Sequence, residues 1–275
     1  MDTRTSEMLA TNQRNWDART PVHVGSAFYD LPGARAGADR LASFEWAELG
    51  DLTGREVVHL QCHLGTDTIC LARAGATVAG LDFSAEAIDQ ARELAAAAGL
   101  AIDYVRADVL DAVAAFGGRR FDSVYTGKGS LVWLPDLDAW ARTVAGLLRP
   151  GGELYLVEFH PLVAALGADA EVADLRIRND LLGTGAAEEC DWPVTYTDGP
   201  PLAGETRSFQ WSHDLGEVVT AVAGAGLRVV SLREHAVLPW RAMAGLVPAG
   251  DGWWRLPEQA PKLPLIYSLR AVRDA

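Results

Sequence analysis

The feature that most constrains the fold is the segment of residues 55–94, in which apolar runs, a tight turn and an acidic residue follow in a fixed order. Its sequence is REVVHLQCHLGTDTICLARAGATVAGLDFSAEAIDQAREL. Residues 56–62 are apolar and β-branched without alternation, which is typical of a strand whose two faces are both covered by helices. Residues 66–74 have helical composition, and Gly75 stands where a left-handed cap would end that helix. The segment therefore predicts a parallel α/β sheet that begins with a strand, a turn and a helix.

A second strand and an acidic residue come next. Residues 77–81 form another apolar run, and Asp82 stands at its carboxyl end. Open parallel sheets bind ligands at this edge, and a carboxylate there can accept hydrogen bonds from both hydroxyls of a ribose. Ser84 is placed to cap the next helix, which has one apolar stripe. The residues of that stripe are Ala87, Ile88, Ala91, Leu94 and Ala95. Together these elements predict a pocket for a cofactor that contains a nucleoside.

The turn after the first strand distinguishes between two kinds of nucleoside cofactor. Dinucleotide-binding folds need the pattern G-x-G-x-x-G, so that the backbone can approach a pyrophosphate. Here Gln61 and His63 occupy the first two glycine positions, and only Gly65 remains. These side chains would crowd a pyrophosphate but not a cofactor that lacks one, such as S-adenosylmethionine. An NAD(P)-dependent oxidoreductase would share the strand order and Asp82, and it stays as an alternative.

Further segments extend the same pattern in order. Residues 102–109 (IDYVRADV) fit a third strand, residues 121–127 (FDSVYTG) a fourth, and residues 147–159 (LLRPGGELYLVEF) a helix end, a turn and a fifth strand. With these motifs the chain resembles the class I S-adenosylmethionine-dependent methyltransferases, and its first motif is similar to an LQCHxGxDT variant of small-molecule methyltransferases. The resemblance implies a Rossmann-like α/β fold, with a seven-stranded, mostly parallel sheet, helices on both faces, and closing strands at 227–233 and 265–273.

The resemblance also implies which residues hold the cofactor. Asp108 falls where the family contacts the adenine amino group. The first motif departs from the family pattern, because His59, Gln61 and His63 replace the usual aspartate and two glycines. The expected cofactor-binding residues are Gln61, His63, Gly65, Asp67, Asp82, Phe83, Asp108, Val109 and Gly127.

The remaining segments are expected to elaborate one domain, since α/β folds of this length are commonly undivided. Residues 1–50 predict an N-terminal helical lid over the cofactor, and residues 51–160 the cofactor-binding core. Residues 161–212, with an acidic turn at Glu188-Glu189, predict a cap inserted at the carboxyl edge of the sheet. Residues 213–275 complete the core sheet.

Charge and composition limit the classes of molecule that this chain is expected to bind. The formal net charge is −13, and the only lysines are Lys128 and Lys262. Such a chain would repel a phosphate backbone, so nucleic acid is not expected as a substrate. The N-terminus lacks the apolar region of a signal peptide, and no run approaches the length of a membrane span. A small-molecule substrate and a cytoplasmic location are therefore expected.

Cys62 lies between two histidines in the sequence, His59 and His63. Cys62 and Cys70 fall in predicted core elements, which favours reduced thiols without a disulfide framework. His59, Cys62 and His63 have side chains that zinc accepts. In a strand, however, His59 and Cys62 point to opposite faces, so no metal is expected.

Aromatic residues suggest the substrate class. The chain has nine tryptophans, most of them in connections rather than in the predicted strands. Each one alone is explained by packing of irregular segments against the core. Collectively they favour an aromatic or heteroaromatic natural product of secondary metabolism, and their faces could hold a sulfonium by cation–π attraction. The acceptor atom, O, N or C, stays open. The expected substrate-binding residues are Tyr29, Lys128, Trp133, Trp192, Trp211 and Trp240.

Catalysis of methyl transfer needs mainly alignment and exclusion of water. A base is needed only when the acceptor loses a proton, and histidines are the first candidates. His213 precedes a predicted helix at 215–222, whose dipole would favour a neutral imidazole. His160 follows the fifth strand, and His23 lies in the predicted lid. For each of these three histidines, the alternative is a purely structural role. For the chain as a whole, the alternative is a non-catalytic protein that binds the cofactor.

Overall fold

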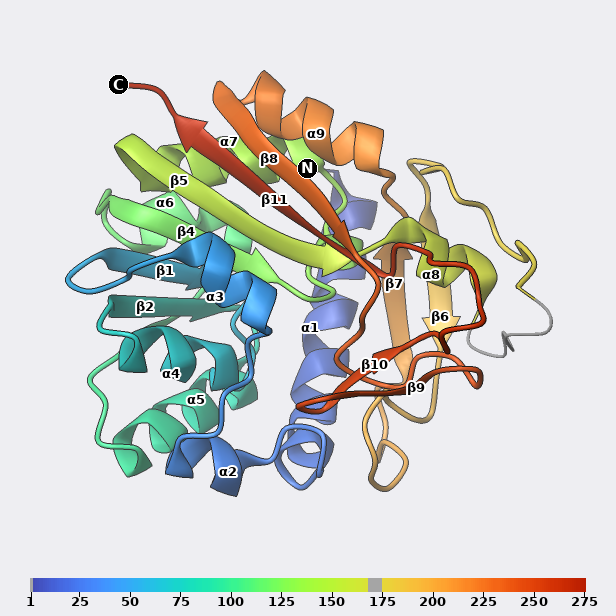
Figure 1. Ribbon diagram of the computed structural model, residues 1–275. Coiled ribbons are helices and arrows are strands. Elements are labelled where there is room, and N and C mark those ends of the chain that lie inside the picture. Colours follow the sequence, from blue (N-terminus) through green and yellow to red (C-terminus); the bar gives the residue numbers. More distant parts are fainter. Residues whose placement is uncertain (1, 168–174) are drawn as a thin grey trace.

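The computed structural model describes residues 2–167 and 175–275, and its centre is a seven-stranded sheet (Figure 1). The strand order is β3-β2-β1-β4-β5-β11-β8. Strand β11 runs antiparallel to both of its neighbours, and the other pairs in the sheet are parallel. The strands are β1 (Glu56–Leu60), β2 (Thr77–Asp82), β3 (Asp103–Arg106), β4 (Phe121–Gly127), β5 (Leu148–Phe159), β8 (Leu227–His235) and β11 (Ile266–Arg273). The predicted Rossmann-like, mostly parallel α/β fold is confirmed.

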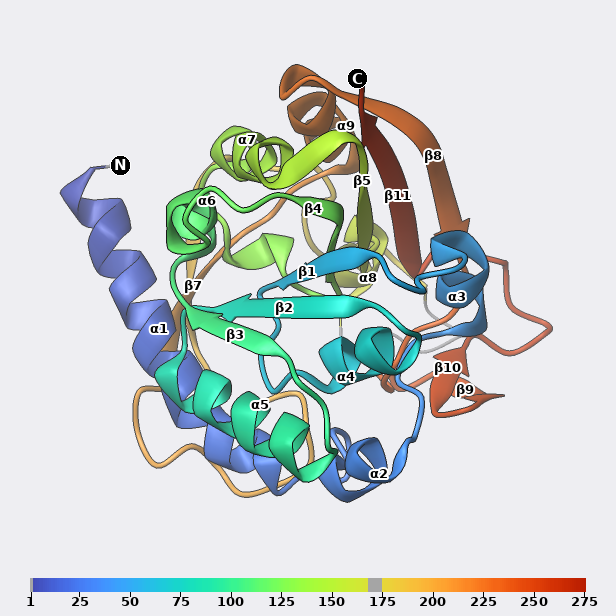
Figure 2. The same ribbon diagram turned by 90° about the vertical axis from the view of Figure 1, so that its left-hand side faces the viewer.

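Helices cover both faces of this sheet (Figure 2). One face packs against α6 (Ala112–Ala115), α7 (Leu137–Leu147) and α9 (Leu215–Gly224). The other packs against α3 (Ser43–Leu49), α4 (Thr66–Arg73) and α5 (Ala85–Ala97). Val57 and Val58 point to opposite faces and both are buried. This two-sided burial explains why the strand sequences are apolar without alternation.

The helix that follows β2 agrees with its sequence pattern. The Ser84 hydroxyl accepts a hydrogen bond from the N–H of Ala87 at 3.1 Å, so it caps α5 as expected. The buried residues of α5 are the predicted ones, Ala87, Ile88, Ala91, Leu94 and Ala95. Gly75, after α4, has the left-handed conformation expected of it, with φ +92°.

Three local predictions are wrong. Strand β1 ends at Leu60 rather than at residue 62, because the backbone turns into the left-handed region at Gln61. Strand β3 spans Asp103–Arg106, since Asp108 already caps the 3-10 helix η1 (Val109–Asp111). Glu188-Glu189 is not a turn but part of β6 (Ala187–Asp191), which pairs with β7 (Arg207–Trp211).

The N-terminal segment folds as α1 (Thr3–Val24), α2 (Leu31–Ala36) and α3. Helix α1 crosses the carboxyl ends of the neighbouring strands and lies beside β7 (Figures 1 and 2). The Asn12 amide bonds the edge of β7 twice, donating to the Phe209 carbonyl at 2.8 Å and accepting from the Phe209 N–H at 2.7 Å. Gln13 donates to the carbonyl of Phe83 at 2.9 Å. Helix α1 thereby joins the inserted hairpin β6-β7 to the core.

Other connections complete this side of the molecule. They contain η2 (Leu131–Trp133), α8 (Pro161–Leu166), β9 (Val247–Gly250) and β10 (Trp253–Arg255). Residues 168–174, part of the predicted cap, lie outside the described residues. Within the described ranges, no helix is long and apolar enough to cross a membrane.

Candidate functional site

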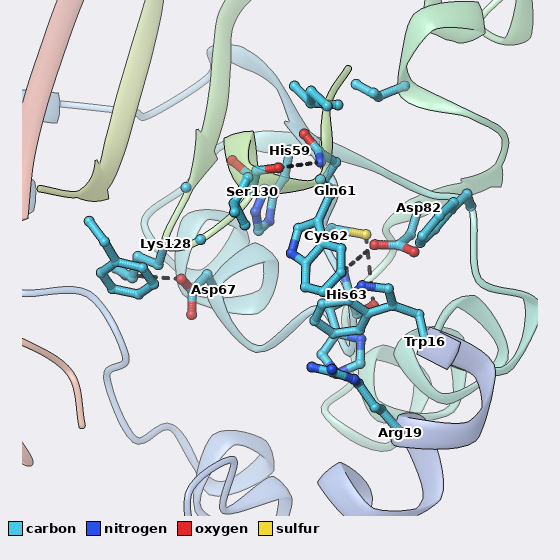
Figure 3. Close-up of a pocket in the computed structure, with 18 of the residues that line it drawn as sticks. Trp16, Arg19, His59, Gln61, Cys62, His63, Asp67, Asp82, Lys128 and Ser130 are labelled. Carbon is cyan, nitrogen blue, oxygen red and sulfur yellow. Dashed lines mark hydrogen bonds and ion pairs between the residues drawn. The ribbon is translucent and has the colours of Figure 1, made fainter. Parts of the chain in front are cut away.

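A cavity of about 370 Å³ opens at the carboxyl ends of β1, β2 and β4, beneath α1 (Figure 3). It brings together most of the residues that the sequence predicts for the cofactor. Gly65 is the exception, since it shapes the turn without lining the cavity. The predicted residues that line it are Gln61, His63, Asp67, Asp82, Phe83, Asp108, Val109 and Gly127.

Asp82 is fixed by the backbone on both of its oxygens. Its Oδ2 accepts from the N–H of His63 and its Oδ1 from the N–H of Ser84, each at 2.9 Å. The side chain lines the cavity although only 6% of the residue is exposed. Burial raises the pKa of Asp82 to about 6. A carboxylate has about four acceptor positions, so this one can still accept from two hydroxyls of a ligand.

The turn after β1 has an unusual backbone that accounts for its departure from glycine. Gln61 and His63 adopt positive φ angles of 55° and 47°. The Gln61 amide donates to the carbonyl of Ser130 at 3.0 Å, which ties this turn to the exit of β4. Gly65 has φ +72°, and a Cβ there would lie 2.2 Å from the Tyr104 hydroxyl oxygen. Within this turn, Gly65 is the residue that must be glycine for steric reasons.

A buried ion-pair group closes one end of the cavity. The Lys128 ammonium lies 2.9 Å from a Glu45 oxygen and 3.0 Å from an Asp67 oxygen. Burial alone would lower the pKa of Lys128, but these two carboxylates raise it above its ordinary value. Burial alone would raise the pKa of Asp67, but Lys128 and His59 hold it below its usual range. Lys128 was expected among the substrate-binding residues; the structure gives it two carboxylate partners, and its side chain also borders the cavity.

An aromatic wall from α1 and η2 faces the cavity. The Trp16 ring lies 5.2 Å from that of Trp133 and 5.0 Å from that of His63, edge to face in both cases. The Arg19 guanidinium lies within 5.5 Å of both indoles, at 5.3 Å from Trp16 and 5.4 Å from Trp133. Trp16 and Arg19 are absent from the sequence predictions. Their signal was helical spacing, because Trp16, Arg19 and His23 lie at i, i+3 and i+7 on one face of α1.

His23 stands directly behind this wall. Its Nδ1 lies 2.8 Å from Nε2 of His63, and its Nε2 lies 2.7 Å from the Thr195 hydroxyl. Burial lowers the pKa of His23 to about 2 and that of His63 to about 3. Both imidazoles are therefore neutral near pH 7, and His63 is the one that lines the cavity.

The structure does not bring His213 or His160 into the cavity. His213 Nε2 lies 2.9 Å from the Leu134 carbonyl oxygen, to which it donates. His160 caps α8 by accepting from the N–H of Leu162 at 3.1 Å, and its other nitrogen lies 3.1 Å from Glu234. Neither lines the cavity, so their positions do not favour the role of base expected for them.

Most of the predicted substrate-binding residues line the cavity, but one does not. Tyr29, Lys128, Trp133, Trp192 and Trp240 line the cavity, whereas Trp211 is buried in β7 outside it.

Two contacts join the N-terminal segment to the inserted segment over the cavity. The Tyr29 hydroxyl is hydrogen-bonded to that of Tyr196, a cavity residue that the sequence predictions omit. Asp198 accepts from the N–H groups of Ala27 and Phe28 at 2.9 and 3.1 Å.

His59, Cys62 and His63 have side chains of the kinds that bind zinc. His59 Nδ1 lies 2.8 Å from the Thr68 hydroxyl of α4, and Cys62 packs against α5 on the same side of the sheet, so the prediction that these two side chains point to opposite faces is wrong. Across the described residues, no group of three or more His, Cys, Asp or Glu side chains is placed to hold a metal ion.

Comparisons with known proteins agree with this geometry. Residues 57–152 match a family described as Methyltransferase domain. The ubiquinone biosynthesis O-methyltransferase of an Escherichia coli strain is 30% identical over 155 residues, which are 53% of this chain. The match spans 64% of that relative's length.

Two solved structures show the same fold. An S-adenosylmethionine-dependent methyltransferase from Mesorhizobium loti has a TM-score of 0.53 and 20% identity, over 84% of this chain and 99% of that one. DhpI in its complex with SAH has a TM-score of 0.56 and 16% identity, over 97% of each chain.

Proposed function

We propose that this chain, which contains a class I S-adenosylmethionine-dependent methyltransferase domain, transfers the methyl group to a small, flat acceptor held beneath the N-terminal helices. The observation that carries the proposal is one cavity that combines the cofactor residues of the sheet edge with an aromatic wall from α1 and η2. The first part offers a nucleoside site, and the second offers space for an acceptor beside it.

The residues of the sheet edge fit the cofactor. Asp82 has free acceptor positions for the ribose hydroxyls, and Asp108 borders the cavity for the adenine amino group. Asp67 is held ionised, so it can pair with the ammonium of the methionine end. The indoles of Trp16 and Trp133 give the cavity a flat apolar wall. When bound, the cofactor supplies a methyl group activated by a positively charged sulfur.

The same residues fit a dinucleotide poorly. Side chains at Gln61 and His63 occupy the turn that a pyrophosphate needs, and Asp67, Asp82 and Asp108 line the cavity as anions or potential anions. These carboxyl groups would repel the two phosphates of NAD(P). The oxidoreductase alternative is therefore disfavoured by charge as well as by shape.

The protein contributes alignment and exclusion of water. The Tyr29–Tyr196 contact and the Asp198 bonds hold the predicted lid against the predicted cap, so the cavity is shielded from solvent on that side. His63 is kept neutral, because burial lowers its pKa to about 3, so it adds no positive charge to the cavity near pH 7. His23 orients His63, while His213 is a candidate for positioning Trp133 through the Leu134 carbonyl.

The acceptor is an aromatic or heteroaromatic small molecule of the secondary-metabolite kind. Trp133, Trp192, Trp240, Tyr29 and Tyr196 give the cavity flat apolar surfaces on several sides. The O-methyltransferase relative favours oxygen as the acceptor atom.

The test is methyl transfer from S-adenosylmethionine to a panel of phenols, aromatic amines and carbon acids, measured as S-adenosylhomocysteine release. We expect turnover of phenols that falls about 5- to 30-fold in Trp133→Ala, since loss of a stacked aromatic contact costs about 1–2 kcal/mol. Trp254→Ala, in β10 and outside the cavity lining, is the matched control. Cofactor binding without turnover of any acceptor class would favour the non-catalytic alternative.

A further inference from the structure

Arg19 is a buried cation without a counter-ion in the described structure. It projects from α1 together with Trp16 and borders the cavity, yet only 2% of the residue is exposed (Figure 3). Its Nε and Nη2 atoms are buried and make no hydrogen bond. Burial lowers the pKa of Arg19 from its ordinary value, and its titratable neighbours are Tyr196, Tyr29 and Cys190 rather than a carboxylate. A guanidinium stays charged under these conditions, so a charge is held away from water with two donor nitrogens unused.

The other basic residues of the cavity already have partners. Lys128 is paired with Glu45 and Asp67. Arg40 donates to the carbonyl of Phe28 and lies over the Phe28 ring. Among the residues that the structure describes, Arg19 lies against the faces of Trp16 and Trp133 and has no carboxylate partner. An anion that enters the cavity would therefore find unused donors at Arg19.

We infer that Arg19 binds a carboxylate carried by the methyl acceptor, so that the acceptor class is an aromatic carboxylic acid. This inference rests on the proposed function. A guanidinium presents its donors as a planar fork that matches a carboxylate bidentately. Because indoles flank the guanidinium, a flat ring attached to that carboxylate would lie among aromatic side chains.

The position of Arg19 favours the acceptor over the cofactor as the source of the carboxylate. Tyr196 and Cys190, which are among its neighbours, belong to the inserted segment and not to the cofactor-binding core. Under the proposed function, Asp67 would hold the ammonium of the cofactor's amino-acid end, at the side of the cavity away from Arg19 in Figure 3. Carboxyl groups at Asp82 and Asp108 would repel a carboxylate placed at the nucleoside end.

The experiment is calorimetric titration of benzoate and of benzamide, its neutral isostere, into protein saturated with S-adenosylhomocysteine. The wild type should bind benzoate at least about tenfold more tightly than benzamide, as expected for charge-assisted hydrogen bonds. Arg19→Gln should abolish that preference. Arg14→Gln is the matched control on the same helix, since Arg14 is exposed and paired with Glu205, and it should keep the preference. Arg19→Lys keeps the charge but not the planar fork of donors, so it should keep part of the preference for benzoate. This variant replaces Arg19→Gln in the test if Arg19→Gln does not fold.

A parallel titration separates the two sources of carboxylate and the two proposals. S-Adenosylmethionine and its decarboxylated analogue should bind Arg19→Gln with the same ratio of affinities as the wild type. If Arg19→Gln lost the preference for S-adenosylmethionine over its decarboxylated analogue, the carboxylate would belong to the cofactor and the inference would be overturned. Equal binding of benzoate and benzamide by the wild type would overturn it as well. If the wild type bound no S-adenosylhomocysteine, the proposed function itself would fail, which is a different result.

Discussion

Asp82 gives the sharpest prediction, because its ionisation should control cofactor affinity. The carboxyl group has a pKa of about 6, raised by burial above the ordinary 3.8. Above pH 6 the group is ionised and can accept from both ribose hydroxyls while it keeps its bonds to the N–H groups of His63 and Ser84. Below pH 6 a proton occupies one acceptor position. Cofactor affinity should therefore fall as the pH falls through about 6.

The size of the effect follows from the bonds at stake. Hydrogen bonds to a charged acceptor contribute about 1.5–3 kcal/mol, which corresponds to about a 10- to 100-fold change in dissociation constant. The raised pKa also has a cost for the fold. A folded pKa of about 6 against 3.8 in the unfolded chain costs about 3 kcal/mol of stability at neutral pH, and this cost disappears as the pH falls toward 4. As the pH falls from about 7 to about 4, cofactor affinity should therefore fall while the contribution of Asp82 to the free energy of unfolding rises.

The assay is titration of S-adenosylhomocysteine by calorimetry from about pH 5 to about pH 8 in the wild type and in Asp82→Asn. Asp82→Asn should bind about 10- to 100-fold more weakly at neutral pH and should lose the step in affinity near pH 6. Asp89→Asn, on the exposed side of α5, is the control and should behave as the wild type. Wild-type affinity in Asp82→Asn at neutral pH, or a wild-type profile that is flat through pH 6, would refute the ribose assignment.

Other contacts give further predictions. Lys128→Met leaves Glu45 and Asp67 without their cation and should lower the free energy of unfolding by about 3–5 kcal/mol in a denaturant titration, whereas a loss below about 1 kcal/mol would show that the ion pairs contribute little. Glu158 accepts from the N–H groups of Gly129, Ser130, Leu131 and Phe159, so Glu158→Gln should destabilise the protein by about 2–4 kcal/mol, and an unchanged midpoint would refute this role. His213→Ala should raise the acceptor KM through a displaced Trp133 with kcat and cofactor affinity nearly unchanged; loss of kcat alone would restore His213 as the base.

The core could be predicted from the sequence because each of its elements has a local signal. Apolar runs without alternation marked the buried strands, and Ser84 and Gly75 marked helix ends with side-chain or backbone requirements of their own. Boundaries were less accurate at β1 and β3. The left-handed conformation at Gln61 is one that a glutamine adopts only in a supporting tertiary context, so no rule based on composition anticipates it.

The candidate site likewise contains some residues that could be predicted from the sequence and others that could not. Asp82 was predictable because the end of β2 fixes where its side chain lies, and Asp108 was expected from the resemblance to the methyltransferase family. Trp16 and Arg19 were not, because they come from a helix far from those strands in sequence, and only packing of α1 on β7 brings them to the cavity. His213 was favoured for its place before a helix, but its hydrogen bond to the Leu134 carbonyl depends on tertiary structure. Lys128 likewise depends on Glu45, which precedes it by more than eighty residues.

The most direct test of the central claim is thermal unfolding with S-adenosylmethionine, S-adenosylhomocysteine, NAD and NADP added separately. A ligand at a hundred times its dissociation constant adds about 2.7 kcal/mol to the free energy of unfolding, which is a measurable rise in Tm. Stabilisation by the first two ligands alone is the predicted result. Stabilisation by NAD or NADP alone would contradict the methyltransferase assignment, and no shift with any of the four would contradict the claim that this cavity binds a nucleoside cofactor.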